Sequence, residues 1–402
     1  MLTPQQLANS ANDIVNLYGK FDEMIVQDIA RRIVKAGEVT DTAIFQLHAL
    51  QNSGMLYDEI IMKVAEITKK SDEAISRLFI DAAVQSLKYD MSIYRAAGLN
   101  PLPLNMSPSA IQVLEAGILK TQGNLNNLTR TTAVSAQKAF ISASTMAEMQ
   151  VESGAYDVAA AIRTAIKTVA ANGAEVIYPS GHTDKLDVAV RRNVMTGLGQ
   201  TTSQISELYA DEMECDIMEI TAHSGARPTH AAWQGQLVSR SGKRGYLSLD
   251  DIGYGTGAGF AGWNCRHDWY PYIEGISSRM YDNKSLAALE EKNIEYNGNK
   301  YTEYEAEQKM RVMERQIRAT KRELLALQAA IQASENDVSQ DGLKIDYAKS
   351  SVKLKRQKSQ LSNFSETTGI LKDTARAQVY GFGRSEAQKA AWANRRYQEA
   401  FS

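Results

Sequence analysis

The chain has 402 residues, of which 44% are hydrophobic, 23% charged and 7% aromatic. This length exceeds what a single hydrophobic core usually holds, so we expect more than one structural unit. The 45 basic and 47 acidic residues leave a net charge of −2, which excludes nucleic-acid binding by bulk charge alone.

The sequence opens with MLTPQQLANSANDIVNLYG, which lacks the positively charged segment and the apolar block of a signal peptide. No later stretch approaches the roughly eighteen consecutive apolar residues of a membrane-spanning helix. The two cysteines, Cys215 and Cys265, are too few for a disulfide framework. We therefore expect no secretion by signal peptide, no membrane spanning, and stability from packing in a reducing compartment.

Helix-start signals dominate the sequence up to about residue 215. Thr3-Pro4-Gln5-Gln6 combines an N-cap, a proline at the first helical position and a glutamine three residues after the cap. Ser71-Asp72-Glu73 is expected to begin a second helix, because acidic residues are favoured in a first turn, and Ser107-Pro108 a third. Apolar residues at helical spacing are expected to line one buried face: Ile75, Leu78, Phe79, Ala82 and Leu87.

Two breaks interrupt this helical part of the chain. Pro101, Pro103 and Pro108 lie in NPLPLNMSP, which is typical of a linker between two helical groups. The second break is IYPSGHTDK, residues 177–185. We therefore predict an N-terminal helical region over residues 1–100 and a second helical region over residues 101–215.

The composition changes sharply between about residues 216 and 275. Ten of the 26 glycines, three of the four tryptophans and three of the five histidines lie between His223 and Gly275. The short runs DIMEITA and QGQLVSR are typical of small strands. The sequence therefore predicts a small α+β domain over residues 216–275, which is expected to lean on the helices because so short a segment buries little surface alone.

No proline follows Pro271, so the last part of the chain is free to form long helices. Two heptad series predict an antiparallel, coiled-coil-like hairpin within a C-terminal region, residues 276–402, whose stripes pack on each other or on another copy of the chain. The predicted fold class is mainly α, with the small central α+β domain between helical regions. The first series is Ala306, Met310, Met313, Ile317, Thr320, Leu324, Leu327 and Ile331, and the second is Leu343, Tyr347, Ser350, Leu354, Gln357, Leu361 and Phe364.

Four side chains of the central region suit a zinc ion: His223, His230, Cys265 and His267. Their spacing matches no standard zinc finger, so histidines that only hydrogen-bond within the fold are the simpler interpretation. Cys265 is also a candidate nucleophile, with His267, His230 or Asp268 as its base, although only proximity in sequence supports this.

The glycine content of GYGTGAG, residues 253–259, suggests a phosphate-binding loop. Such a loop follows a strand and opens a helix. Gly262, Trp263 and Asn264 come soon after it, so no helix is expected to open here. The run therefore favours a flexible or tightly turned loop over a nucleotide site.

Two basic stretches of the predicted hairpin are candidates for contact with a DNA backbone. Residues 309–322 hold six basic residues and only one acid, Glu314, and residues 344–358 hold six and only Asp346. A solvated charged face is the alternative. The residues singled out for phosphate contact are Arg315, Arg318, Lys355 and Arg356.

Short motifs run from the central region towards the C-terminus: His223-Ser224-Gly225-Ala226-Arg227-Pro228, His230, Trp233-Gln234-Gly235, Gly253-Tyr254-Gly255, Asn264-Cys265-Arg266-His267, Tyr304-Glu305-Ala306, Asn363-Phe364-Ser365, Thr368-Gly369 and Gly381-Phe382-Gly383-Arg384. In order and separation, these motifs resemble the phage minor capsid protein 2 family, which is more distantly related to head morphogenesis proteins of the Mu F type. F-type domains tend to end in Cys-x-Cys, whereas His267 takes the second position here; a metal site accepts this replacement and a disulfide does not.

The resemblance implies a low-copy virion protein, not an enzyme, that contacts the portal protein and the inner capsid. Its expected partners also include major capsid or scaffolding proteins during head assembly in the host cytoplasm, and ejection with the DNA is a further option. No cofactor is expected other than the candidate zinc. Two alternatives stay open: a zinc- or cysteine-dependent hydrolase acting after ejection, and a packaging accessory that contacts phage DNA. The motif residues expected to fix the small domain are His223, Arg227, Pro228, His230, Trp233, Gln234, Gly235, Asn264, Cys265, Arg266 and His267.

Overall fold

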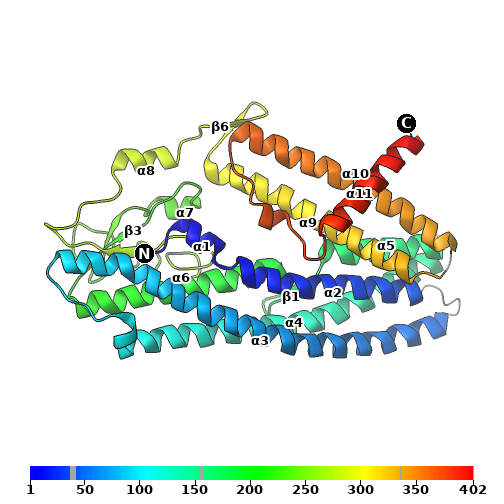
Figure 1. Ribbon diagram of the computed structural model, residues 1–402, viewed down its shortest axis with the longest axis horizontal. Coiled ribbons are helices and arrows are strands. Elements are labelled where there is room, and N and C mark those ends of the chain that lie inside the picture. Colours follow the sequence, from blue (N-terminus) through cyan, green and yellow to red (C-terminus); the bar gives the residue numbers. More distant parts are fainter. Residues whose placement is uncertain (37–41, 154–156, 336, 402) are drawn as a thin grey trace. The chain divides into compact units, whose positions relative to one another are not determined.

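The computed structural model describes residues 1–36, 42–153, 157–335 and 337–401 (Figure 1). The described chain is mainly helical with a few small sheets, which confirms the predicted fold class. Contacts divide it into two compact units, each assembled from segments far apart in the sequence. Unit 1 comprises Met1–Val15, Lys69–Asn126 and Val190–Gln308, and unit 2 comprises Asn16–Thr68, Asn127–Ala189 and Lys309–Ser402.

The first half of the chain forms long helices, several of which contribute residues to both units. Thr3 caps the first helix through the predicted capping box with Gln6. The proline-rich break is confirmed: a single 3-10 turn, Leu104–Met106, fills it, and Ser107 Oγ accepts a hydrogen bond from Ala110 N at 3.3 Å to cap the next helix. The helices are α1 (Pro4–Ser10), α2 (Asn12–Ala36), α3 (Thr42–Ala96), α4 (Pro108–Glu152), α5 (Val158–Asn172) and α6 (Leu186–Glu212).

The prediction that a helix begins at Ser71 is wrong, because α3 runs through Ser71-Asp72-Glu73 without interruption. No glycine or proline flanks the triplet, and Ser71 is fully buried. Burial of a helix face outweighs weak local start signals. The predicted face is otherwise correct: Ile75, Phe79, Ala82 and Leu87 are buried and Leu78 is half-buried.

Within unit 1, glycine and threonine pair reciprocally between α4 and α6. A Cβ atom on Gly117 would lie 2.0 Å from Oγ1 of Thr201, and one on Gly197 would lie 2.2 Å from Oγ1 of Thr121. Only glycine allows backbones to approach this closely. The two pairs therefore bring the N-terminal part of α4 against α6.

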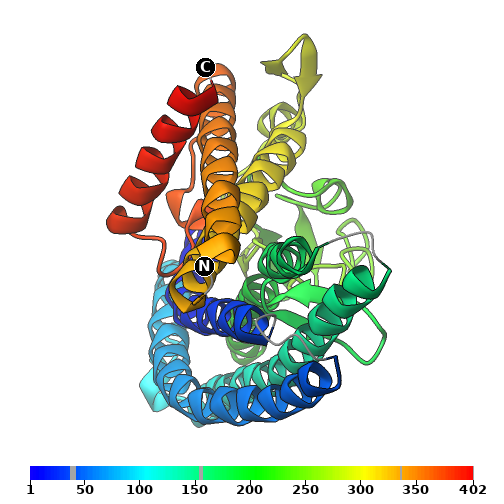
Figure 2. The ribbon, with the colours of Figure 1, turned by 90° about the vertical axis from the view of Figure 1, so that its right-hand side faces the viewer.

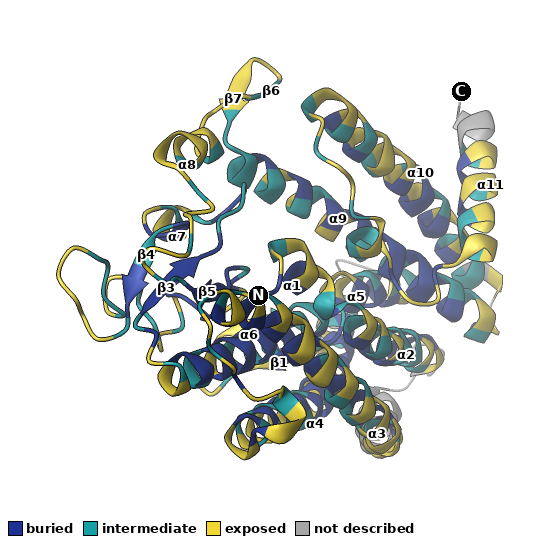
Figure 3. Ribbon diagram, turned by 60° about the vertical axis from the view of Figure 1, so that its left-hand side comes forward, coloured by how far each residue is buried: buried dark blue, intermediate teal, exposed yellow. Residues whose placement is uncertain are grey.

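The central domain is built on a three-stranded antiparallel sheet in unit 1. Strand β3 (Ile217–Ile220) lies between β4 (Leu237–Ser239) and β5 (Trp269–Pro271), with Met218 opposite both Val238 and Pro271. The strands predicted from DIMEITA and QGQLVSR are thus confirmed. All residues of β3 and β5 are buried, as the dark blue colour of this sheet in Figure 3 shows.

The sheet leans on the helices of unit 1, as expected for a domain with so little core of its own. Trp269 is fully buried, and its Nε1 donates a hydrogen bond to the carbonyl of Ser203 on α6 at 3.1 Å. Tyr254 donates to Glu207 of the same helix at 2.8 Å. More exposed elements accompany the sheet (Figure 3). The short helix α7 (Pro228–Ala231) lies between β3 and β4 in the sequence, whereas α8 (Asn283–Leu289) and the hairpin of β6 (Ile294–Tyr296) with β7 (Asn299–Tyr301) come after β5.

Unit 2 contains the C-terminal helices. The break at residues 177–185 forms a hairpin of β1 (Glu175–Ile177) and β2 (Thr183–Lys185). The helices α9 (Glu303–Ala333) and α10 (Asp337–Thr368) are followed by a 3-10 turn, Thr374–Ala377, and by α11 (Arg384–Phe401). Figure 2 shows α11 alongside α10, to which it makes many contacts.

Contacts along α9 and α10 have the antiparallel order of a helical hairpin. Gln340 donates to the carbonyl of Ile331 at 3.2 Å, and Ser350 donates to Glu323 at 2.7 Å. The predicted stripes are largely buried, including Ile317 and Leu327 on α9 and Phe364 on α10. No helix in the described parts of the chain combines the length and apolarity that a membrane crossing requires.

Candidate metal centre

Three side chains of unit 1 bring their ligand atoms together within the central domain. Nδ1 of His230 lies 3.4 Å from Nδ1 of His267. Sγ of Cys265 lies 3.5 Å from the His267 nitrogen and 3.9 Å from the His230 nitrogen. All three residues are 2–3% exposed, and their ligand atoms lie within 4.8 Å of one another. We call them the His-Cys-His cluster; they are three of the four candidate ligands chosen from the sequence.

Tight turns hold these side chains in place. His230 is the third residue of α7, which begins with Pro228, a residue whose fixed φ suits a first helical turn. Asn264 has a φ of +54°, and the turn it makes is closed by a hydrogen bond from Cys265 N to Gly262 O at 3.1 Å. Because β5 begins two residues after His267, the cluster connects α7 to the start of a buried strand.

The glycine run supplies a further contact to the cluster. A Cβ atom on Gly259 would lie 2.1 Å from the carbonyl oxygen of Gly253, so the loop can close on itself only with glycine there. The closed loop presents the carbonyl of Ala258, which accepts a hydrogen bond from Nε2 of His230 at 2.8 Å. Residues 251–262 form turns rather than a helix, as predicted.

Hydrogen bonds fix which imidazole nitrogens are free to bind a ligand. Nε2 of His230 faces a carbonyl, and Nε2 of His267 lies 3.3 Å from Oε1 of Gln234. That oxygen also accepts from His223 N at 3.1 Å, and Nε2 of Gln234 donates to Glu290 at 3.1 Å, which sets the orientation of the amide. Since both outer partners are acceptors, each Nε2 carries the hydrogen and each Nδ1 directs a lone pair inward.

Burial keeps both imidazoles in the neutral form that can act as a ligand. It lowers the pKa of His230 to about 4 and that of His267 well below its ordinary value, and neighbouring histidines and arginines lower the latter further. Burial also raises the pKa of the Cys265 thiol to about 11. A thiol in this state is a poor nucleophile at neutral pH.

His223 lies beside the cluster and outside the group of three. Its Nδ1 lies 2.7 Å from the Ser224 carbonyl, and its ring centroid lies 4.6 Å from that of His267. Its Nε2 is buried, and no described residue forms a hydrogen bond with it. Burial, followed by the positive charge of Arg266, lowers the pKa of His223 to about 4.

The other motif residues contact the loops of the domain. Trp233 is buried, and its ring centroid lies 4.4 Å from that of His230 and 4.8 Å from that of His267. Two motif arginines bond the backbone of neighbouring segments: Arg227 donates to the Trp263 carbonyl and Arg266 to the Gly225 carbonyl at 2.9 Å. Two other motif residues bond side chains through their own backbone: Asn264 N donates to Thr196 Oγ1 at 3.3 Å, and the Gly235 carbonyl accepts from Arg279 at 2.7 Å.

Two residues that hold the central domain in place have little or no sequence signal of their own. Ala258 acts through its backbone carbonyl, which any residue would supply. Proximity in sequence indicated Asp268 only as a base for Cys265. Asp268 is 1% exposed and accepts hydrogen bonds from Leu2 N at 2.6 Å and Trp269 N at 3.0 Å. Its carboxylate is therefore used to fasten the first residues of the chain to β5.

Comparison with known proteins decides which family these motifs belong to. A family model described as "Phage minor capsid protein 2" matches residues 2–366. The chain belongs to this phage minor capsid protein family.

The minor capsid protein is also similar to two phage proteins that are each named "Structural protein". The one from Lactococcus phage LL-H is 25% identical over 263 residues, which are 61% of this chain and 69% of that protein. The one from Lactococcus phage mv4 is 37% identical over 84 residues, which are 20% of this chain and 57% of that protein. No solved structure matches the chain.

The basic residues singled out on the hairpin of the minor capsid protein differ in their surroundings. Arg318 lies 3.2 Å from Asp187 and also donates to the Arg376 carbonyl, so its guanidinium holds unit 2 together. Arg315, Lys355 and Arg356 are exposed. Of the four residues named for phosphate contact, these three present their charge to solvent.

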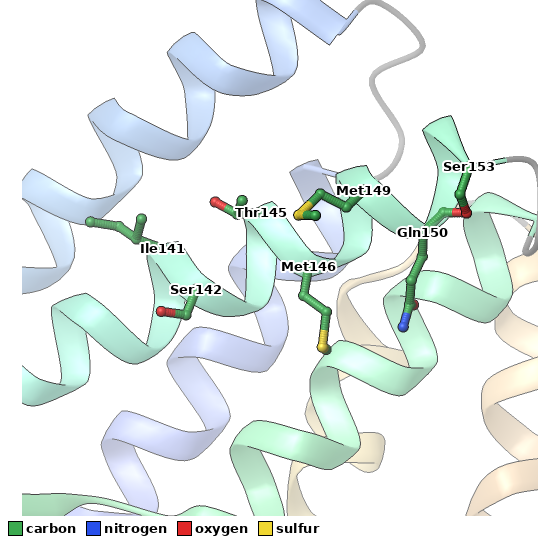
Figure 4. Close-up of a pocket in the computed structure, with 7 residues that line it drawn as sticks. All are labelled: Ile141, Ser142, Thr145, Met146, Met149, Gln150 and Ser153. Atoms are coloured by element: carbon green, nitrogen blue, oxygen red, sulfur yellow. The ribbon is translucent and has the colours of Figure 1, made fainter.

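A shallow pocket of the minor capsid protein lies along the C-terminal part of α4 in unit 2 (Figure 4). It encloses about 520 Å³, and it is lined by residues of α4 and by Ser153 directly after that helix. None of the motif residues of the central domain belongs to this lining, which consists of Ile141, Ser142, Thr145, Met146, Met149, Gln150 and Ser153.

Proposed function

We propose that this minor capsid protein is a non-enzymatic connector in the head of a tailed phage. It contacts the portal protein and the inner capsid during head assembly in the host cytoplasm. The observation that carries the proposal is the family match over residues 2–366. The central domain is the rigid part of the connector, and the helices are its contact surfaces.

The buried state of the His-Cys-His cluster supports a structural role over hydrolysis. A hydrolytic site needs a nucleophile or an activated water that a substrate can reach. Cys265 is 3% exposed, its thiol is protonated at neutral pH, and both neighbouring imidazoles are enclosed. These features favour a domain fixed by its polar side chains over a zinc- or cysteine-dependent hydrolase.

The long helices offer apolar side chains to partners such as major capsid or scaffolding proteins. Met62 on α3 is 69% exposed, Leu119 on α4 is 68% exposed and Trp392 on α11 is 55% exposed. Methionine and tryptophan are enriched in protein interfaces relative to the rest of the surface. A second copy of the chain is another partner for the same surfaces.

Quantitative mass spectrometry of purified virions tests the proposal. We expect the protein at low copy in DNA-filled heads, enriched together with the portal protein after mild disruption, and absent from isolated tails. A protein found only in the soluble lysate would contradict the assignment. Comparing full heads with heads emptied of DNA then decides whether it leaves with the genome.

The exposed cations Arg315, Lys355 and Arg356 support a second candidate role, contact with packaged DNA. Binding through phosphates weakens steeply with salt, with a logarithmic slope of about −0.9 per phosphate contacted. Reversing the three charges should flatten that slope, whereas Arg77→Glu, an exposed change on α3, should not. DNA binding with an unchanged slope in the triple variant would rule out these residues as the contact.

A further inference from the structure

We infer that the His-Cys-His cluster binds one zinc ion, which acts as a structural cross-link of the central domain. Nδ1 of His230, Nδ1 of His267 and Sγ of Cys265 are its protein ligands. The inference concerns the interior of unit 1, so it stands or falls independently of which virion proteins the chain contacts.

The spacing of the three atoms is that of a tetrahedral zinc site. Bonds of about 2.0–2.1 Å to nitrogen and about 2.3 Å to sulfur place neighbouring ligand atoms roughly 3.3–3.6 Å apart. Two separations in the structure, 3.4 and 3.5 Å, lie in this range, and the third, 3.9 Å between Cys265 Sγ and His230 Nδ1, is slightly longer. Imidazole and thiolate together favour zinc over magnesium or calcium, which prefer oxygen ligands.

The hydrogen bonds around the cluster leave its centre without an electron-pair acceptor. Ala258 and Gln234 hold the hydrogens of both imidazoles on the outer nitrogens, so two Nδ1 lone pairs face each other at 3.4 Å. Two acceptors cannot bond one another, and the single hydrogen of Cys265 serves only one of them. A metal ion takes the lone pairs of all three atoms, and outer carbonyl partners of this kind are usual for histidine ligands.

Binding changes the protonation of one group. The thiol of Cys265 releases its proton to solvent as the bond from sulfur to zinc forms, and the imidazoles bind through existing lone pairs. Because the ligands come from α7 and from the segment that leads into β5, the ion joins two stretches that have few backbone hydrogen bonds between them.

Metal analysis of the full-length protein, purified without a histidine tag, is the first test. We expect about one zinc per chain. Cobalt exchanged into the site should give visible bands of a tetrahedral ion and a thiolate-to-cobalt charge-transfer band, because a cysteine is a ligand. It should also quench Trp233, whose ring lies 4.4 Å from the ring of His230, and Trp233→Phe should abolish that part of the quenching.

Substitutions distinguish this cluster from other thiols and histidines. Cys265→Ser should remove the charge-transfer band, whereas Cys215→Ser, a buried free thiol elsewhere in unit 1, should keep it. His230→Gln should lose zinc, and His223→Gln should retain it. Replacing the outer partner in Gln234→Leu should weaken zinc binding about 10- to 100-fold.

Two results would overturn the inference. One is wild-type protein that stays free of metal after incubation with zinc and shows no charge-transfer band with cobalt. The other is a band that survives Cys265→Ser or disappears in His223→Gln. Because the cobalt spectrum of the wild type already reports the thiolate, the test holds even if a ligand variant fails to fold.

Discussion

Trp269 is predicted to be the main anchor of the central domain. It is fully buried on β5, donates to Ser203 on α6 at 3.1 Å, and packs against Phe260 at a centroid distance of 4.9 Å. Truncating a buried tryptophan to alanine costs about 3–5 kcal/mol, because apolar contact is lost and a cavity remains. Trp269→Phe keeps most of that volume and removes one hydrogen bond, so we expect a loss of about 1–2 kcal/mol.

Trp263 provides the matched control, since it lies six residues earlier and its side chain is 60% exposed. Trp263→Ala should change stability by no more than about 1 kcal/mol. In thermal unfolding followed by circular dichroism, a unit of this size shifts by roughly 2–4 °C per kcal/mol, so Trp269→Ala should lower the transition by about 6–20 °C. Equal shifts for the Trp269→Ala and Trp263→Ala variants would refute the assignment of Trp269 as an anchor.

Three further predictions concern charge and backbone. Burial raises the pKa of Glu314 from 4.5 to about 7, so folding favours its protonated form. The stability that this carboxyl contributes is fully present below about pH 4.5 and is lost as pH rises through 7. Glu314→Gln should therefore flatten the pH dependence of the melting temperature. Arg322→Leu leaves the buried Asp22 without the guanidinium that lies 3.4 Å away, so the free energy of unfolding should fall by about 3–5 kcal/mol in chemical denaturation. Adding Asp22→Leu should restore much of this loss. No recovery in the double variant would argue against the pair. Gly259→Ala should disrupt the central domain, because its Cβ would collide with the Gly253 carbonyl. Gly123→Ala, which faces open space on α4, should stabilise the protein by about 0.5–1 kcal/mol. Similar melting curves for the two variants would contradict the close approach of Gly259 to Gly253.

Periodicity predicted the helices well, because burial of an apolar face is what a long helix requires. The stripe that includes Ile317 and Leu327 is buried as expected, and the capping box at Thr3 is present. The start predicted at Ser71 failed, since a capping residue also fits inside a helix when nothing breaks the backbone. The four domain ranges stay a prediction. They are consecutive because a sequence pattern reports only local composition, whereas each compact unit combines segments that are far apart in the chain.

The residue types of the candidate site were predictable, but their arrangement was not. His230 and His267 suggested a ligand pair from their identity, and nothing in the spacing showed that Cys265 would meet both. The outer partner Ala258 acts through its carbonyl, which leaves no trace in the sequence. Likewise, Arg318 looked like its exposed neighbour Arg315 until its partner Asp187, far away in the chain, was known.

The interleaving of the two units bears on how the polypeptide is made. Unit 1 needs residues up to Gln308, and unit 2 begins at Asn16 yet needs residues from Lys309 onward. A ribosome must therefore synthesise about three quarters of the chain before either unit can close, and the long amphipathic helices emerge before their partners exist. We expect newly made chains to depend on chaperones, and truncated forms to aggregate rather than to fold as separate halves.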